Sequence, residues 1–231
     1  KHAQTSRRLF PGHPVHAITN GAHPHWTGAA FATLFDRHLP RWRHEPQCLM
    51  RADQIADEEI WTAHKTQKQS LITFVRDSAA VAFDPDTPII GLARRMTAYK
   101  RPDLLFSDLD RLQSIARKHP LQIVLAGKAH PRDETGKSLI ETIHKHIREL
   151  RNSIRIAYLP DYNMATAAQL VAGVDLWLNT PLRPLEASGT SAMKAAFNGI
   201  PSLSVLDGWG AEGCVEGVTG WAIGPATESA N

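Results

Sequence analysis

Short apolar runs that lack polar alternation recur along the second half of the chain, separated by longer stretches with apolar residues at helical spacing. A strand that is apolar on both faces is typical of a parallel sheet that helices cover on both sides. The pattern therefore predicts an α/β fold with a doubly wound parallel sheet. The expected strands span 88–93, 121–126, 154–159, 174–178, 202–206 and 221–223, and the expected helices span 102–118, 135–152, 165–172 and 190–197.

The first part of the chain has a different pattern. It is rich in His, Pro and Gly at its start, which predicts loop, and it then shows two stretches of helical periodicity. Asp84-Pro85-Asp86 breaks the second of these stretches. We therefore expect a loop and helical segment over 1–84 and the sheet domain over 85–231. Within the first segment the expected elements are loop over 1–28, helices over 29–38 and 52–78, and an irregular stretch over 40–50.

The composition indicates an ordinary globular protein, with 42% hydrophobic and 21% charged residues. The net charge of +3 is too small to argue for nucleic acid or a membrane surface, so we expect neither as a partner. No apolar run reaches the length of a membrane span, and no signal peptide is visible. Cys48 and Cys214 are far apart and make no disulfide framework, which favours free thiols and a cytoplasmic location.

The predicted topology gathers four polar segments at one place. Each follows a predicted strand, and the carboxyl ends of parallel strands meet at the same edge of a sheet. Ligands of open α/β sheets bind at that edge. We therefore expect the candidate residues to converge in the segments 94–101, 127–131, 161–162 and 179–189.

Glu186-Ala187-Ser188-Gly189-Thr190-Ser191-Ala192-Met193-Lys194 is the most informative stretch. It places a lysine in a small apolar helical run, where poor solvation favours the free amine that a Schiff-base lysine needs. The turn at 189–191 would open a helix whose bare N–H groups can bind phosphate. A reactive lysine beside a phosphate cradle suits pyridoxal 5′-phosphate. The alternative is a surface lysine on a helix with a Ser/Thr cap.

Basic residues cluster after the first predicted strand, at Arg94, Arg95, Lys100 and Arg101. Arginine grips phosphate oxygens as a planar fork and lysine adds a point charge, so the cluster favours phosphate binding. The alternative is a solvated basic loop that opens the predicted helix at 102. A basic helix start is unfavourable unless an anion lies there.

These segments together resemble one known family. The stretch 186–194, with Asn198-Gly199 and Asp207-Gly208 after it, resembles the lysine segment of the α-glucan phosphorylases. The segments 91–101, 127–131, 161–163 and 19–21 also occur in the family's order. The resemblance is closest to the shorter bacterial and archaeal branch. It implies the C-terminal, Rossmann-like half of a GT-B glycosyltransferase that is incomplete at both ends, with 1–84 at the junction with a missing N-terminal domain.

The resemblance implies transfer of a terminal glucosyl unit from an α-1,4-glucan to inorganic phosphate, giving glucose 1-phosphate with retention and using pyridoxal phosphate. It leaves chain-length preference, allosteric control and oligomeric state open. By the same resemblance the catalytic residues are Arg95, Lys100 and Lys194. The cofactor-binding residues are Lys194, Arg94, Gly189, Thr190, Ser191 and Tyr162, and the substrate-binding residues are Glu186, Ser188, Gly189, Asn20 and Tyr99.

Two other readings stay open. A nucleotide-sugar glycosyltransferase such as a glycogen synthase also uses an Arg/Lys pair and a glutamate before a helix, but it needs no lysine at position 194. The second alternative is that the chain is an inactive fragment. The family's active site lies between two domains, so we expect the chain as cut not to turn over glucan.

We expect no metal, because the histidines of the first loop lie among Pro and Gly with no cysteine or acid nearby. They are His13, His16, His23 and His25.

Overall fold

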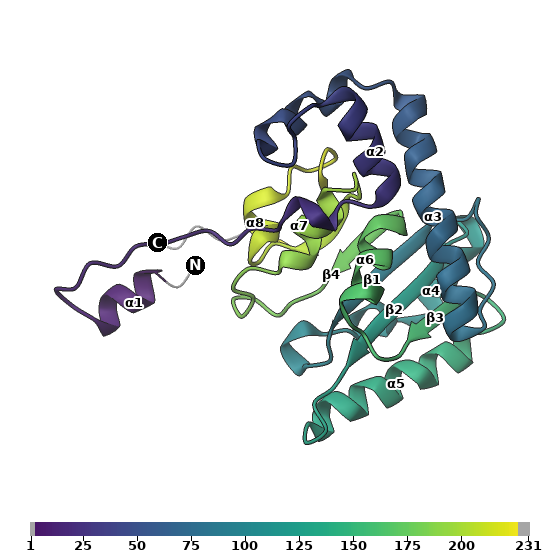
Figure 1. Cartoon of the computed structure of the whole chain (residues 1–231). Helices are drawn as coiled ribbons and strands as arrows, with labels where there is room; N and C mark the ends of the chain where they lie inside the picture. The colour runs from purple at the N-terminus through teal and green to yellow at the C-terminus, as the bar shows by residue number, and fades with distance from the viewer. Residues whose placement is uncertain (1–2, 226–231) are drawn as a thin grey trace.

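The computed structural model describes residues 3–225, and the sheet within that range is open and entirely parallel (Figure 1). Its strand order is β3-β2-β1-β4-β5-β6. Two halves wind outward from the β1–β4 pair, which confirms the predicted doubly wound α/β class. The strands are β1 (Ile89–Arg95), β2 (Gln122–Lys128), β3 (Arg155–Leu159), β4 (Leu176–Asn179), β5 (Ser202–Val205) and β6 (Gly220–Ile223).

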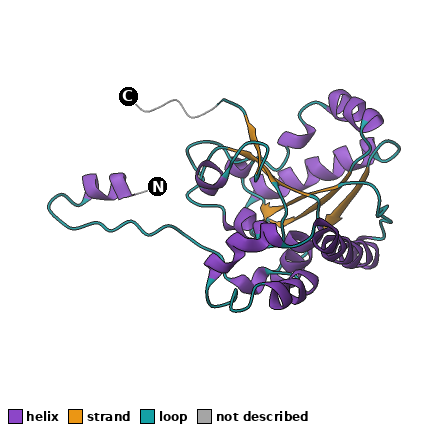
Figure 2. Ribbon diagram, turned by 90° about the horizontal axis from the view of Figure 1, so that it is seen from above, coloured by secondary structure: helices purple, strands orange, loops and turns teal. Residues whose placement is uncertain are grey.

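Helices lie on both sides of the strands (Figure 2). Several have α-helical geometry: α1 (Ala3–Leu9), α2 (Ala29–His38), α3 (Asp57–Ala79), α4 (Leu109–Lys118), α5 (Glu134–Leu150), α6 (Met164–Gly173), α7 (Thr190–Ala196) and α8 (Trp209–Gly213). Four 3-10 segments are described: η1 (Pro24–Trp26), η2 (Pro46–Gln54), η3 (Ala98–Lys100) and η4 (Leu104–Phe106). Segment η2 begins inside the stretch over 40–50 that was predicted to be irregular.

Two apolar layers flank the sheet, because successive strand residues point to opposite faces. On one face, Ala93 and Val124 pack with residues of α3, α6 and α7. On the other face, Leu92 and Ile123 pack with residues of α4 and α5. A third cluster joins α2 to the start of α3. Both faces of the central strands are therefore buried, as the uninterrupted apolar runs predict.

Side-chain caps mark the starts of three helices, α4, α5 and α6. Asp108 accepts a hydrogen bond from the N–H of Arg111 at 2.9 Å, and Asp133 accepts one from Gly136 at 2.9 Å. Asn163 caps α6 by accepting from Ala165 and Thr166. Each of these residues satisfies an N–H group that the first helical turn leaves without a partner.

The structure corrects several predicted boundaries. The predicted helix over 102–118 begins only at Leu109, because Asp108 supplies the cap and a 3-10 segment fills the gap. The long helix begins at Asp57 rather than 52, where three acidic residues favour the helix N-terminus. The loop predicted over 1–28 contains α1, whose Ala, Gln, Arg and Leu residues are good helix formers. Helix α8 was not predicted.

Helix α1 projects from one side of the molecule (Figure 1) and buries none of its residues, and its Ala3 and Ser6 line a hollow together with Ser188 and Glu212. The proposed boundary at residue 84 falls in the loop between α3 and β1. Helix α3 nevertheless shares a core with the sheet, since Leu71 and Val75 are fully buried in the same cluster as Ile89. Within residues 3–225, no helix is both long enough and apolar enough to cross a membrane.

A buried polar cluster fastens α3 to the strands. The Asp175 carboxylate accepts from His64 Nε2 at 2.8 Å, from Lys68 Nζ at 2.9 Å and from the Ile89 N–H at 2.7 Å. Lys68 also donates to the Thr87 carbonyl at 3.0 Å. Burial disfavours the charged carboxylate, but these hydrogen bonds outweigh it, so the pKa of Asp175 lies below its ordinary value.

Replacing Asp175 by asparagine should lower the free energy of unfolding by about 3 kcal/mol at neutral pH, because the buried Lys68 ammonium loses its counter-charge. The stability that the aspartate supplies is present above about pH 4, the ordinary pKa of an unfolded aspartate. It is lost as the pH falls through the lower folded pKa. Urea unfolding at several pH values should therefore show the two proteins converging in acid.

The control is Asp77→Asn, which removes an exposed partner of Arg76 and should leave stability near that of the wild type. If the difference in the free energy of unfolding between wild type and Asp175→Asn stays constant from neutral to acidic pH, the stabilising role of the Asp175 carboxylate is contradicted.

Candidate functional site

The carboxyl ends of β1 and β4 meet where the strand order reverses, and Arg94 joins them. Its guanidinium donates from Nη2 to the Leu178 carbonyl at 2.9 Å and to Asn179 Oδ1 at 3.0 Å. Nη1 donates to the Lys100 carbonyl at 2.7 Å. A crevice at this switch point is where open α/β sheets bind ligands.

Arg94 is a buried cation whose hydrogen-bond partners are all neutral. Burial lowers the pKa of Arg94 to about 10, while the nearby Glu186, Tyr99 and Tyr162 act in the opposite direction. The residue therefore keeps its charge at neutral pH. Its Nε atom is buried without a hydrogen-bond partner among the described residues. Its positive field is available to an anion at this edge.

Lys100 and Glu186 form an ion pair across the same edge. Lys100 Nζ donates to Glu186 Oε2, and both side chains are mostly buried. The ammonium also lies 5.0 Å from the centre of the Tyr99 ring. The predicted phosphate lysine and the predicted sugar-binding glutamate are thus in direct contact, a pairing that the sequence analysis did not foresee.

A second loop, Asp207-Gly208-Trp209, supports the Glu186 segment. Asp207 Oδ2 accepts from the Glu186 N–H at 2.8 Å, and the Trp209 N–H donates to the Ser188 carbonyl at 2.6 Å. Gly208 lies between them at φ 56°, and an added Cβ would stand 2.5 Å from the Ser188 carbonyl oxygen. Sequence reasoning gave Asp207 and Gly208 no role, although both follow a strand at the same edge.

Helix α7 and its N-cap carry four of the six predicted cofactor residues, namely Gly189, Thr190, Ser191 and Lys194. Gly189 occupies its N-cap in the left-handed conformation, at φ 77°, and supplies no side-chain cap for the first-turn N–H groups. Thr190 opens the helix. The Ser191 hydroxyl accepts from Trp177 Nε1 at 3.2 Å, which ties α7 to β4. The predicted helix opening at 189–191 is confirmed.

Lys194 lies on α7 beneath an aromatic ring. Its Nζ atom is 3.8 Å from the centre of the Trp26 ring, a cation–π distance. Burial lowers the pKa of Lys194 below its ordinary value, as expected for a poorly solvated lysine.

Asn20 and Ser188, both predicted to bind substrate, line one polar hollow of about 540 Å³ together with Ala187 and Glu212. Tyr162 is half-buried against the core of the sheet. Burial raises the pKa of the Tyr162 hydroxyl, and the positive charge of Arg94 opposes that rise. Arg94 and Tyr162 therefore interact electrostatically at the same strand edge.

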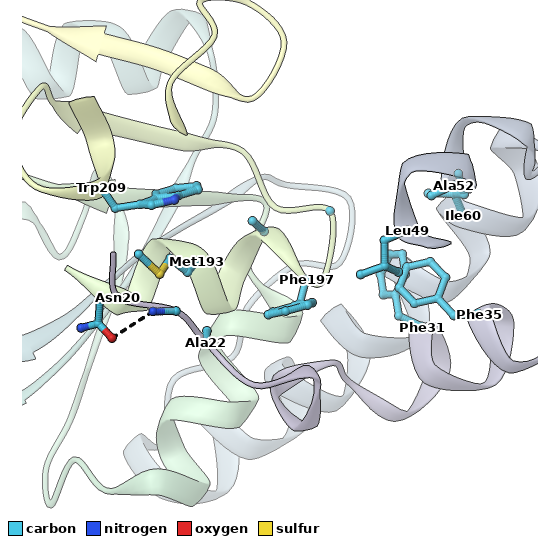
Figure 3. A pocket seen from close by; sticks show the side chains of 13 residues that line it. Asn20, Ala22, Phe31, Phe35, Leu49, Ala52, Ile60, Met193, Phe197 and Trp209 are labelled. Carbon is cyan, nitrogen blue, oxygen red and sulfur yellow. Dashed lines mark hydrogen bonds between the residues drawn. The ribbon is translucent and has the colours of Figure 1, made fainter. Parts of the chain in front are cut away.

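An apolar pocket of about 520 Å³ lies on the other side of α7 (Figure 3). Met193 of α7, the C-cap residue Phe197 and Trp209 form one wall, and apolar side chains of the α2–α3 region form the opposite one (Figure 3). Asn20 stands at its edge, where its Oδ1 accepts from the Gly21 N–H at 2.9 Å. The lining of the pocket is largely apolar, so it offers few of the hydrogen bonds that a polar ligand needs.

Arg95 differs from its neighbours. It is the last residue of β1, and its side chain is exposed and makes no ion pair with a described carboxylate. The structure thus gathers Arg94, Tyr99, Lys100, Tyr162 and Glu186 around one point and leaves Arg95 at the rim. Within residues 3–225, no group of three or more His, Cys, Asp or Glu side chains could hold a metal ion.

The geometry defines a class of protein. A buried arginine, a lysine–carboxylate pair and an uncapped helix start lie at the switch point of a doubly wound sheet, and a second lysine lies nearby with a lowered pKa. Such a site suits an α/β protein that binds an anionic ligand at a strand edge.

The chain belongs to the carbohydrate phosphorylase family, whose sequence model matches residues 17–216. It is 40% identical to the glycogen phosphorylase of Aquifex aeolicus, over 91% of this chain and 34% of that protein. It is also 40% identical to the maltodextrin phosphorylase of Thermococcus litoralis, over 94% of this chain and 29% of that protein. The glycogen phosphorylase of Mycobacterium tuberculosis is 37% identical, over 91% of this chain and 27% of its own length. The chain spans about a third or less of these relatives.

The Gly208→Ala variant should lower the free energy of unfolding by about 2 kcal/mol, because it combines a strained positive φ with a clash against Ser188. Hydrogen exchange at the Glu186 and Trp209 amides should accelerate, since both are held by this loop. Denaturant unfolding and exchange mass spectrometry would measure the two effects.

Gly217→Ala is the matched control, because Gly217 has φ 74° but open space around an added Cβ. It should lower the free energy of unfolding by less than Gly208→Ala does and leave the hydrogen exchange of the Glu186 segment unchanged. Equal exchange in Gly208→Ala and the wild type would contradict the supporting role of the loop.

Proposed function

We propose that this chain carries the phosphate-binding and cofactor-binding half of an α-glucan phosphorylase active site. The reaction moves a terminal glucosyl unit from an α-1,4-glucan to inorganic phosphate, gives glucose 1-phosphate and retains the anomeric configuration. The observation that carries the proposal is the joint placement of Lys194 under Trp26 and of the Lys100–Glu186 pair at one strand edge. The names of the family's members support it.

The residues present fit pyridoxal phosphate. Lys194 has a lowered pKa and is partly exposed, so its amine is available for a covalent bond to an aldehyde. Gly189 leaves the first turn of α7 without a side-chain cap, and Thr190 adds a hydroxyl there. The unpartnered Nε of buried Arg94 supplies a positive charge that a phosphate group would satisfy.

Lys100 and Arg95 are the proposed ligands of the substrate phosphate. Lys100 is neutralised by Glu186 in the structure, so an incoming phosphate competes with that carboxylate for the ammonium. Arg95 stands exposed at the end of β1 and can close on the anion from the rim. Buried Arg94 adds a fixed charge that offsets the repulsion between two phosphate groups.

The sugar faces the opposite side of the Lys100–Glu186 pair. Once Lys100 turns to phosphate, the Glu186 carboxylate can accept hydrogen bonds from glucosyl hydroxyls. Gly189 lies beside it, and Ser188 and Asn20 line the polar hollow. Tyr99 lines the phosphate side through its contact with Lys100. When bound, the cofactor supplies a phosphate group that exchanges a proton with the substrate phosphate, and Lys194 serves as its anchor.

The nucleotide-sugar alternative is less well supported, because that chemistry gives no reason for a lysine with lowered pKa at position 194. We also propose that the 231-residue chain does not turn over glucan alone, since it spans about a third or less of its relatives. The proposed location is the cytoplasm, which the free thiols of Cys48 and Cys214 support.

Incubation with pyridoxal phosphate followed by borohydride should give a stable adduct on Lys194, identified by peptide mapping. Lys194→Arg should abolish it, while Lys128→Arg, at the end of the neighbouring strand, should leave it intact. Pyridoxal without its phosphate should label Lys194 with about ten-fold weaker affinity, because it lacks the interaction with α7. Labelling spread over other lysines in a folded chain that spares Lys194 would contradict the proposal.

Glu186→Gln should tighten inorganic phosphate binding by about ten-fold, because it frees the Lys100 ammonium from a competing carboxylate. Lys100→Met should weaken the same binding by a similar factor. Phosphorus NMR titration would measure both, with Glu134→Gln as the control for removing an exposed, lysine-paired carboxylate. Unchanged phosphate binding in both site variants would place the anion elsewhere.

A further inference from the structure

Asn198 is a buried amide at the end of α7 that the proposed chemistry does not use. Its side chain is 1% exposed, although the residue directly follows the C-cap of a short helix. A buried amide without partners costs free energy, so its hydrogen bonds identify its role. Its side-chain hydrogen bonds reach both α7 and the segment that carries Trp26.

The amide makes three hydrogen bonds to main-chain groups. Asn198 Nδ2 donates to the Lys194 carbonyl at 3.1 Å and to the Trp26 carbonyl at 3.0 Å. Asn198 Oδ1 accepts from the Gly28 N–H at 2.6 Å. One amide nitrogen therefore links the backbone of the lysine to the backbone of the aromatic residue that faces its ammonium.

The other backbone hydrogen bonds of this segment are local, and the Trp26 ring packs against the core of the sheet. Trp26 ends η1, which begins after His23, and its N–H donates to the His23 carbonyl at 3.1 Å. The loop that leads to it passes alongside α7, from Asn20 past Ala22 (Figure 3). Asn198 bonds to this segment on both sides of Thr27, at Trp26 and at Gly28. These two bonds set where the indole lies relative to Lys194.

We propose that Asn198 is a positioning residue that holds Trp26 against the Lys194 amine. With the indole on one side of the ammonium, an aromatic aldehyde reaches the nitrogen from the side that the indole leaves open. Asn198 thereby determines the face of attack on Lys194 without touching the aldehyde. This inference rests on the proposed function for its purpose, but the Asn198–Trp26–Lys194 arrangement can be tested with no cofactor present.

The test uses the ring current of Trp26 as the readout. Reductive methylation with ¹³C-formaldehyde converts lysines to dimethyl-lysines that stay cationic, and Lys194→Arg assigns the resonance of position 194. In the wild-type chain this resonance should lie upfield of the other dimethyl-lysines, because the indole face shields it. Trp26→Leu should return it to the position of an exposed dimethyl-lysine.

Asn198→Asp should shift the resonance toward the exposed position. The substitution keeps the acceptor for Gly28 but turns the donor toward Trp26 and Lys194 into an oxygen that repels both carbonyls. An unshifted resonance in folded Asn198→Asp would overturn the proposal. So would a wild-type resonance identical to that of Trp26→Leu, a comparison that needs no Asn198 variant.

Gln122→Glu is the matched control. Gln122 is also buried, accepts from the Asp84 N–H at 2.7 Å, and donates from Nε2 to the Asp84 and Thr87 carbonyls at 2.9 and 3.2 Å. It lies at the opposite, amino-terminal edge of the sheet, so its substitution should lower stability and leave the Lys194 resonance upfield. If the Lys194 resonance shifts as much in Gln122→Glu as in Asn198→Asp, the shift reports only general destabilisation of the fold, and the proposal is overturned.

Asn198→Ser removes the amide without adding a charge and replaces the aspartate variant if that variant does not fold. An upfield Lys194 resonance in Asn198→Ser would then overturn the inference. If the resonance depends on Asn198 but no pyridoxyl adduct forms on Lys194, the positioning role stands and the proposed function fails. If the adduct forms but the Lys194 resonance does not depend on Asn198, the proposed function stands and the positioning role fails.

Discussion

The buried guanidinium of Arg94 is the interaction on which the site depends. It links the end of β1 to the Leu178 carbonyl and Asn179 at the end of β4, and to the backbone of Lys100. Those strands are neighbours only because the winding direction reverses between them. The same residue thus closes the switch point structurally and leaves a positive charge there, which is what a site for two phosphate groups requires.

Supporting contacts from later in the chain hold the chemical groups around that charge. Asp207 and Trp209 hold the loop of Glu186, and Ser191 ties α7 to Trp177 of β4. Asn198 connects α7 to the Trp26 segment. Each support is a hydrogen bond between elements that meet at the carboxyl edge of the sheet, so the site depends on packing of the whole domain.

Much of this was predictable from the sequence. Apolar runs without alternation predicted the parallel sheet, and the topology rule then brought 94–101 and 179–189 to one edge. The Trp26–Lys194 contact and the Asn198 hydrogen bonds could not be predicted. Asn198 and Trp26 are 172 positions apart, and no local sequence pattern indicates that they are in contact. The start of α4 was misplaced because Pro102 signals a helix start as Asp108 does, and only the cap hydrogen bond decides.

We propose that one strand edge gathers the anion and the reactive lysine. Crystals of the chain grown with selenate, a tetrahedral dianion with an anomalous signal, would show where an anion binds. An anomalous peak is expected within hydrogen-bond distance of Lys100 Nζ, on the side of the β1–β4 crevice that α7 faces. Selenate bound only at sites remote from Lys100, Arg95 and the start of α7 would contradict it.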